Sequence, residues 1–227
     1  MLLQCETEAD PGDTGWLSAA TLASLAELNE EGLELLAAQA ELSAADLPLQ
    51  QLAARWRTLE PAARRRAGAC PYLLLDADFA APERWDLRAH EPLHPFFTVA
   101  AARPLTQAIF AFAWHLSRCQ PAAAALLLAL APAGTARLAA CTWREARALA
   151  ASQTGRLRPR WWQRPGFWRA LLAAAAATEF QTLERVRAHG QILFAASLHR
   201  APARAPAPLR RPAGVPAAQA PSAPSAA

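Results

Sequence analysis

The chain has 227 residues, of which 53% are hydrophobic and only 7% aromatic, and all 23 of its basic residues are arginine. This length accommodates one domain of ordinary size with tails, or two small domains. Alanine and leucine dominate the apolar residues and favour helices, while isoleucine, valine, threonine and tyrosine, which favour strands, are scarce. The composition therefore argues against a β-sheet and predicts an all-α fold, a bundle of about six to eight helices.

Charge is divided unevenly along the sequence. Residues 1–100 contain 16 acidic residues and 7 arginines, a net charge of −9, whereas residues 101–227 contain 3 acidic residues and 16 arginines, a net charge of +13. This difference indicates an acidic part that contacts protein partners and a basic part suited to polyanions such as DNA. A GC-rich genome, which favours arginine, alanine and proline codons together, is the alternative explanation of the arginine content.

The sequence pattern argues against several functional classes. The four cysteines are far apart, which matches neither a disulfide framework nor a structural zinc site and fits a reducing cytoplasm. The first residues lack the basic and apolar regions of a signal peptide, and the apolar runs fall short of the roughly 20 residues that cross a bilayer. No nucleophile elbow, phosphate loop or dinucleotide fingerprint is present. The sequence therefore predicts no catalysis, no cofactor and no small-molecule substrate.

The first hundred residues predict a flexible N-terminus over 1–15 and then an acidic helical region over 16–100. Leucines at helical spacing, with glutamates on the opposite face, indicate the first helix of this region. Pro48 interrupts the second helix and Pro61 begins the third. The expected helices span 16–42, 43–59 and 61–69.

Residues 70–85 are the least helical part of the sequence before the tail and predict an extended segment or a packed loop. In this segment Asp76 and Asp78 either pair in a site or cap a loop. The motif "HEPLH" that follows, His90 to His94, matches the HExxH pattern of zinc proteases, which needs both histidines on one face of a continuous helix. Because Pro92 breaks such a helix, the sequence predicts two histidines in a loop and no bound metal.

Residues 101–200 predict a second helical region, which is basic. After it, residues 201–227 form an Ala/Pro-rich tail that is too poor in large apolar side chains to fold, so we expect it to be disordered. The helices of the basic region are expected over 104–118, 121–130, 133–140, 143–152 and 165–199, where the last range holds one helix or two.

The arginine-rich stretch 142–172 carries the main functional signal. Thr142 and Glu145 have the spacing of a capping box, so a helix begins at Trp143, whose ring is expected to face inward. The short helix before it joins through Cys141 and Thr142, which is the outline of a helix-turn-helix. Arginine clusters dominate phosphate binding and also pair with guanine edges. The residues predicted to bind nucleic acid are Arg137, Arg144, Arg147, Arg156, Arg158, Arg160 and Arg164.

The tryptophans in and after this stretch leave alternatives open. Trp161, Trp162 and Trp168 anchor the next helix in the core, stack on bases, or lie with arginine at a membrane interface. Likewise, Arg158 and Arg160 either meet phosphates or solvate a loop that Pro159 holds open.

Residues 105–161 contain a set of alanine, leucine and other positions that follows a known family pattern without a gap. These positions are Ala113, Leu116, Ala124, Leu128, Leu138, Ala139, Thr142, Leu149, Ala150, Arg160 and Trp161. In them the stretch resembles FlhD, the D subunit of the proteobacterial flagellar transcriptional activator. The family's Asp after its first helix is replaced by Gln120, and its "LGI" by "LAL" at 128–130. The resemblance implies an all-helical, dimer-forming regulator that works with a partner subunit on DNA.

These observations lead to a hypothesis and two alternatives. The hypothesis is a cytoplasmic, oligomeric transcriptional regulator that binds DNA directly or through a partner subunit, with flagellar or motility genes as the candidate targets. The first alternative is a non-enzymatic helical adaptor or chaperone-like protein of a secretion or motility system that does not bind DNA. The second is a helical module that contacts anionic membranes through its Arg/Trp segment.

Overall fold

The computed structural model describes residues 17–38, 47–85 and 95–198. Within them the fold is all-α, as the sequence predicts, with nine α-helices. The expectations for the N-terminus, the "HEPLH" motif and the tail concern residues outside these ranges. The helices are α1 (Ala19–Ala38), α2 (Leu47–Arg57), α3 (Pro61–Gly68), α4 (Val99–Cys119), α5 (Pro121–Leu128), α6 (Pro132–Ala140), α7 (Trp143–Gln153), α8 (Pro165–Ala177) and α9 (Phe180–Leu198).

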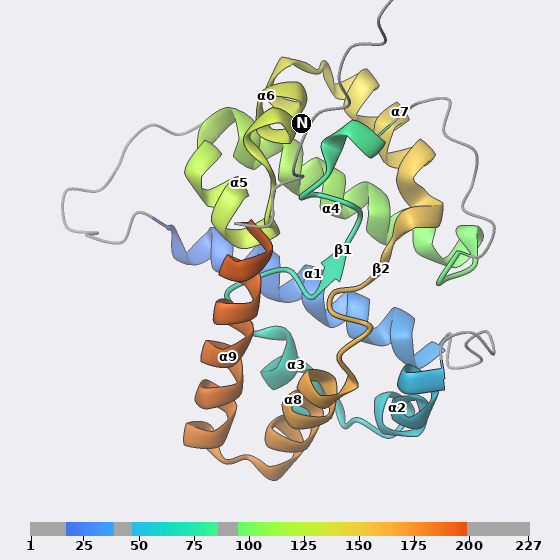
Figure 1. Ribbon diagram of the computed structural model, residues 1–227, viewed down its shortest axis with the longest axis vertical. Helices are drawn as coiled ribbons and strands as arrows, with labels where there is room; N and C mark the ends of the chain where they lie inside the picture. Colours follow the sequence, from blue (N-terminus) through green and yellow to red (C-terminus); the bar gives the residue numbers. More distant parts are fainter. Residues whose placement is uncertain (1–16, 39–46, 86–94, 199–227) are drawn as a thin grey trace, which may run out of the picture.

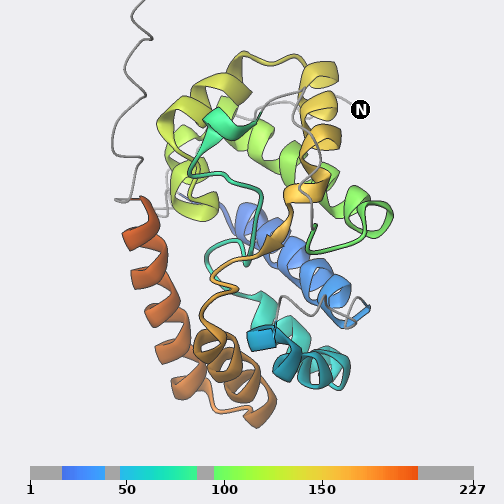
Figure 2. The ribbon, with the colours of Figure 1, turned by 45° about the vertical axis from the view of Figure 1, so that its right-hand side comes forward.

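Helix α1 crosses the middle of the molecule and separates two groups of helices (Figures 1 and 2). On one side α4 packs against α5, α6 and α7, and on the other side α2 and α3 pack against α8. Helix α9 runs along the side of the molecule and packs against α8. Because α1 contacts α2, α3 and α4, it joins the two groups through its buried leucines.

Two helices differ from the prediction at a proline. Pro48 does not interrupt α2, because it is the second residue of the helix, where a backbone N–H has no partner inside the helix. Helix α4 begins at Val99, before the expected start at residue 104, and contains Pro104. A proline inside a helix removes one backbone hydrogen bond, and the burial of Leu105 and Ile109 against the core offsets that loss.

The segment 70–85 is a mostly buried loop, one of the two predicted forms, with a two-residue strand and a short 3-10 helix at Pro82–Arg84. Strand β1 (Leu75–Asp76) pairs antiparallel with strand β2 (Arg158–Pro159), and Asp76 lies opposite Arg158. The side chain of Asn29 in α1 holds this segment: its amide donates to the Gly68 and Tyr72 carbonyls, at 2.9 and 3.0 Å, and its oxygen accepts the Leu74 amide at 2.7 Å. Asn29 is fully buried, so these bonds fix the segment against α1.

One hydrophobic core includes residues from both charge regions of the sequence. Trp56 of α2 meets Trp168 of α8 edge to face, with ring centroids 5.8 Å apart, and Phe79 of the 70–85 segment lies 5.4 Å from Phe110 of α4. The acidic and basic regions are therefore packed together. In the described ranges, none of the helices combines the length and the apolar character that crossing a membrane requires.

Candidate functional site: the arginine–aspartate cluster

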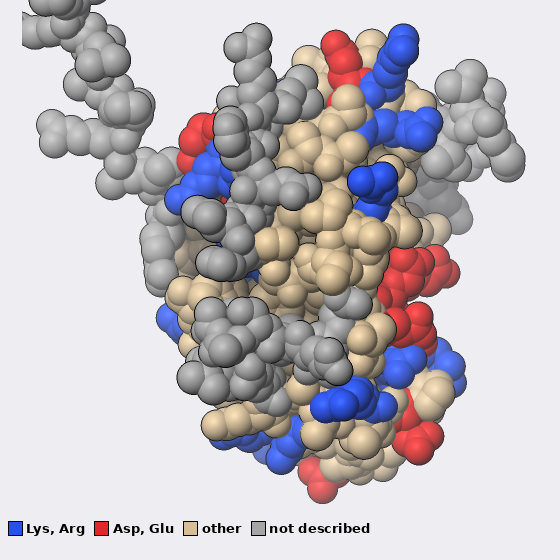
Figure 3. Space-filling model, turned by 90° about the vertical axis from the view of Figure 1, so that its right-hand side faces the viewer, with Lys and Arg blue, Asp and Glu red and all other residues tan. Residues whose placement is uncertain are grey.

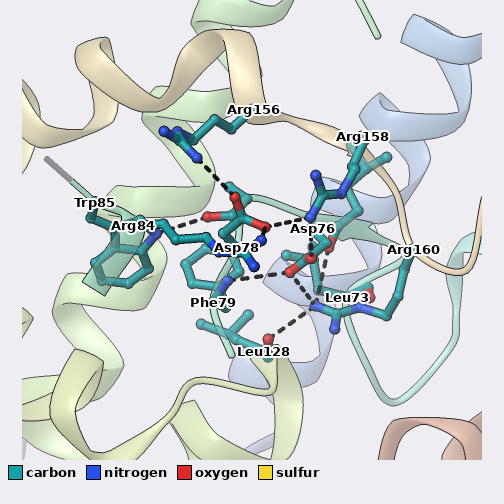
Figure 4. Close-up of polar contacts among 12 residues, drawn as sticks. Leu73, Asp76, Asp78, Phe79, Arg84, Trp85, Leu128, Arg156, Arg158 and Arg160 are labelled. Atoms are coloured by element: carbon teal, nitrogen blue, oxygen red, sulfur yellow. Dashed lines mark hydrogen bonds and ion pairs between the residues drawn. The ribbon is translucent and has the colours of Figure 1, made fainter. Parts of the chain in front are cut away.

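Three of the arginines predicted to bind DNA meet two aspartates between the helical groups (Figure 4). Arg158 belongs to β2, opposite Asp76 of β1, and the Arg160 amide continues the pairing with a bond to the Leu74 carbonyl at 2.8 Å. In extended chains alternate residues lie on one face, which places the side chains of Arg158 and Arg160 beside those of Asp76 and Asp78. The Arg–Asp cluster is defined as these four residues together with Arg84 and Arg156.

Arg160 lies in the interior, with 5% of its side chain exposed. Its Nε donates to the Leu73 carbonyl at 2.9 Å, and its Nη2 donates to the carbonyls of Leu75 at 3.3 Å and Leu128 at 3.0 Å. The same Nη2 lies 3.4 Å from Asp76 Oδ1. Burial lowers the pKa of Arg160, although the Asp76 carboxylate opposes that shift. The assignment of Arg160 as a phosphate contact is therefore corrected, because its guanidinium faces protein oxygens and not solvent.

The Asp78 carboxylate contacts the other three guanidinium groups of the cluster, those of Arg84, Arg156 and Arg158. The Asp78 side chain is 4% exposed and contacts Arg156 Nη1 at 3.2 Å, Arg84 Nη1 at 3.7 Å and Arg158 Nη2 in a short hydrogen bond. The Asp78 backbone has a φ of 58°, and its carbonyl accepts the Ala81 amide at 2.9 Å, which turns the chain toward Arg84. Such left-handed conformations favour glycine but are tolerated by aspartate.

Asp76 caps the loop, which is one of the two alternatives that the sequence left open, and its carboxylate also contacts arginine. Its Oδ1 accepts the Phe79 amide at 3.3 Å, while Oδ2 lies 3.7 Å from Arg158 Nη2. The cluster thus has four guanidinium groups around two carboxylates, and it joins the 70–85 segment to the 156–160 segment. Its contacts are those of a polar connection inside the fold. The structure gives Arg156 and Arg158 carboxylate partners, and both are partly exposed.

The other four predicted arginines lie on the surface. Arg144, Arg147 and Arg164 are exposed, and Arg137 is exposed although its Nη1 donates to the Pro82 carbonyl at 3.2 Å. Helices α6 and α7 follow each other through Cys141 and Thr142 as predicted, and both pack against α4. The capping box is confirmed: Thr142 Oγ1 accepts the Glu145 amide at 3.3 Å, and Glu145 accepts the Thr142 amide at 2.8 Å. Of the seven predicted arginines, the structure therefore brings Arg156, Arg158 and Arg160 together in the Arg–Asp cluster.

The tryptophans divide between core and surface. Trp168 is fully buried and its Nε1 donates to the Arg160 carbonyl at 2.8 Å, as the core interpretation predicts. Trp161 and Trp162 pack against the core and are partly buried. The prediction for Trp143 is wrong: 47% of this residue is exposed. It is the first residue of α7, and its ring contacts that of Trp114, with the ring centroids 5.4 Å apart.

Three structural residues were not predicted from the sequence. Asn29 occupies a helix face that is otherwise leucine and glycine, and a polar residue on such a face signals a buried hydrogen-bonding role. Arg84, which joins the Arg–Asp cluster, has no sequence signal that distinguishes it from other surface arginines. Cys70 and Cys141 are free thiols, whereas Cys119 takes part in a disulfide, a bond that the cysteine spacing did not predict.

The part of the chain that the structure describes contains no group of histidine, cysteine and acidic residues suited to hold a metal ion. In comparisons with known proteins, no family model, no curated protein and no solved structure matches the chain.

Proposed function

We propose that the protein is a helical adaptor that works through protein contacts, one of the functions that the sequence predicts. The observation that carries this proposal is the pairing of the Arg-rich stretch with the protein's own carboxylates. A segment that binds a polyanion needs free guanidinium groups, whereas Arg156 and Arg158 contact Asp78, and Arg160 is buried.

The surface near the N-terminus of α7 supports the same proposal. The ring of the exposed Trp143 contacts the Trp114 ring at a tilt of 54°, and the Arg118 guanidinium lies 4.8 Å from the centre of the Trp114 ring. Tryptophan and arginine are the side chains most enriched among the residues that dominate protein–protein binding energy. An adaptor that forms homo- or hetero-oligomers would use such a surface.

Direct DNA binding is the second candidate, and one specific observation favours it. Arg144, Arg147 and Arg164 are exposed, and the first two lie on α7, the second helix of the predicted helix-turn-helix pair. The resemblance to the D subunit of the flagellar activator belongs to this candidate. In such a protein, Arg144 and Arg147 would contact phosphates or base edges, directly or next to a partner subunit.

Retention on immobilised duplex DNA over a range of salt concentrations separates the two candidates. The adaptor proposal expects the full chain to elute at or below physiological salt, and its protein partners to stay bound after nuclease treatment of a cell extract. DNA binding would instead give a log affinity that falls with log salt, by about 0.9 per phosphate contact.

Matched arginine variants make the test specific. Replacing Arg144 and Arg147 together by Gln should leave the elution salt of the adaptor on the DNA column unchanged, because the adaptor does not bind DNA. For a DNA-binding protein the same double variant would flatten the salt slope, whereas Arg185→Gln, an exposed arginine on α9, would have a smaller effect. A steep slope that only the double variant removes would contradict the adaptor proposal.

A further inference from the structure

A groove lies between α2, α3 and α8, on the opposite side of α1 from α4 to α7 (Figure 1). Its volume is about 260 Å³, just below the range of about 300–1,000 Å³ that is typical of pockets for small ligands. The groove has room for a few side chains presented by another protein. Its lining residues are Arg55, Thr58, Leu59, Glu60, Ala63, Arg66, Leu172, Ala173 and Ala176.

The base and one wall of the groove are apolar and made of small residues. Leu59, Ala63 and Leu172 are buried, while Ala173 and Ala176 are exposed one turn apart on α8. Alanines at this spacing present a smooth surface to which a helix backbone can come close, and an apolar side chain of that helix can occupy the groove.

The helices around the groove are basic, which favours a partner with acidic side chains. Helices α2, α3 and α8 contain no acidic residue, and Glu60 is the only acidic residue in the lining. Arg66 is held at the groove because its Nε donates to the Ala175 carbonyl at 2.8 Å. Among the described residues, neither the Arg66 Nη groups nor the Arg55 side chain has a hydrogen-bond or ion-pair partner. The arginines on the three helices are Arg55, Arg57, Arg64, Arg65, Arg66 and Arg169.

We infer that this groove binds an amphipathic helix of a partner protein whose apolar stripe is flanked by acidic residues. The apolar side chains contact the leucine and alanine floor, and the carboxylates pair with Arg55 and Arg66. The inference rests on the proposed adaptor function and names the class of partner segment that the adaptor recognises.

The test selects peptides from a randomised, helix-forming 12-residue phage library on the purified full chain. We expect enriched peptides to carry Asp or Glu beside apolar residues spaced three or four apart, and their binding to weaken at high salt. Filling the groove with Ala173→Leu, or reversing its charge with Arg55→Glu, should each lower affinity at least about tenfold, the effect of losing a dominant contact. Both residues are exposed, and thermal unfolding checks that each variant folds.

Ala170→Leu is the matched control, because Ala170 is exposed on α8 and does not line the groove. Three outcomes would overturn the inference: no enrichment, enrichment of neutral or basic peptides, or equal losses in Ala170→Leu and Ala173→Leu. Self-association of the pure chain that Ala173→Leu abolishes would assign the groove to a second copy instead, and would also overturn it. Protein partners captured after nuclease treatment that survive Ala173→Leu would leave the adaptor function intact while this inference fails.

Discussion

Arg160 keeps its charge in the interior because four oxygen atoms surround its guanidinium. Three are the carbonyl oxygens of Leu73, Leu75 and Leu128, and the fourth belongs to Asp76. A planar group with five donors satisfies acceptors in several directions, which the single ammonium of lysine does not reproduce. Removing it takes this donor from three carbonyls inside the protein and leaves Asp76 with Arg158 as its remaining arginine contact.

We therefore expect Arg160→Gln to lower the free energy of unfolding by about 3–5 kcal/mol, the usual cost of breaking a buried ion pair. Arg164→Gln, at an exposed arginine four residues later, should change it by no more than about 0.5 kcal/mol. Urea denaturation of both variants measures the difference. Equal, small effects would mean that the contacts of Arg160 contribute little to stability.

The buried thiol of Cys70 gives stability a dependence on alkaline pH. Burial raises the pKa of Cys70 from 9.0 to about 11, while a hydrogen bond with Tyr72 and the charge of Arg187 oppose the shift. Between these pH values the unfolded chain has released a proton that the folded chain retains. The stabilising contribution is thus complete below pH 9.0 and is lost as pH rises through about 11.

We expect the unfolding free energy to fall with pH over this range, and to fall less steeply in Cys70→Ala. Few other groups titrate in this range, because the chain has one tyrosine and no lysine, although burial also raises the pKa of the Cys141 thiol. Burial also raises the pKa of that tyrosine, Tyr72, so it accounts for part of the slope that remains. Identical slopes in wild type and variant would show that Cys70 does not titrate differently in the two states.

At the scale of elements, helix α9 packs closely against Tyr72 at Gly190, because glycine has no side chain. Gly190 faces the ring of Tyr72, and a Cβ at this position would lie 1.8 Å from Tyr72 Oη and 2.5 Å from Cζ. The ring has little freedom to move, because Trp161 and Phe194 pack against it and its hydroxyl donates to the Arg187 carbonyl at 3.2 Å. A glycine is therefore needed where α9 crosses Tyr72.

This contact predicts that Gly190→Ala destabilises the protein by about 1–3 kcal/mol, the usual cost of overpacking. Alanine is intrinsically the better helix former by about 1 kcal/mol, so helix propensity alone gives the opposite sign. Gly166→Ala in α8 is the control, since no atom lies within 4 Å of its added Cβ, and stability there should stay constant or rise. A stabilised Gly190→Ala would show that α9 shifts away from Tyr72 freely.

The elements themselves were mostly predictable, and their contacts were not. Leucine spacing, prolines at first positions and the Thr142–Glu145 capping box are local signals, and they predicted the helices from residue 105 onward closely. The partners of Arg158 and Arg160 lie some 80 residues earlier in the sequence, where no local pattern identifies them. Helical phase likewise predicted an inward Trp143, but at the first position of α7 burial depends on which neighbouring helix reaches the ring.

At the scale of the whole molecule, the charge division along the sequence does not become a division in space. Acidic and basic side chains alternate down the face in Figure 3, and the Arg–Asp cluster joins Asp76 and Asp78 from the acidic region to three arginines from the basic one. Trp56 of the acidic region also packs on Trp168 of the basic region. The two sequence regions are therefore parts of one folding unit.

It follows that residues 95–198, expressed without the preceding region, should not fold cooperatively. This fragment lacks the carbonyls of Leu73 and Leu75 and the Asp76 carboxylate that contact Arg160, as well as Trp56, which packs on Trp168. Two-state folding requires coincident transitions by different probes, so circular dichroism and tryptophan fluorescence during urea denaturation give the measurement. Residues 17–198 as one chain should show a single sharp transition by both probes, whereas the fragment should show a broad one. A fragment that unfolds as sharply as the longer chain, at the same urea concentration, would establish the basic region as an independent domain. Its exposed arginines would then favour the DNA-binding candidate.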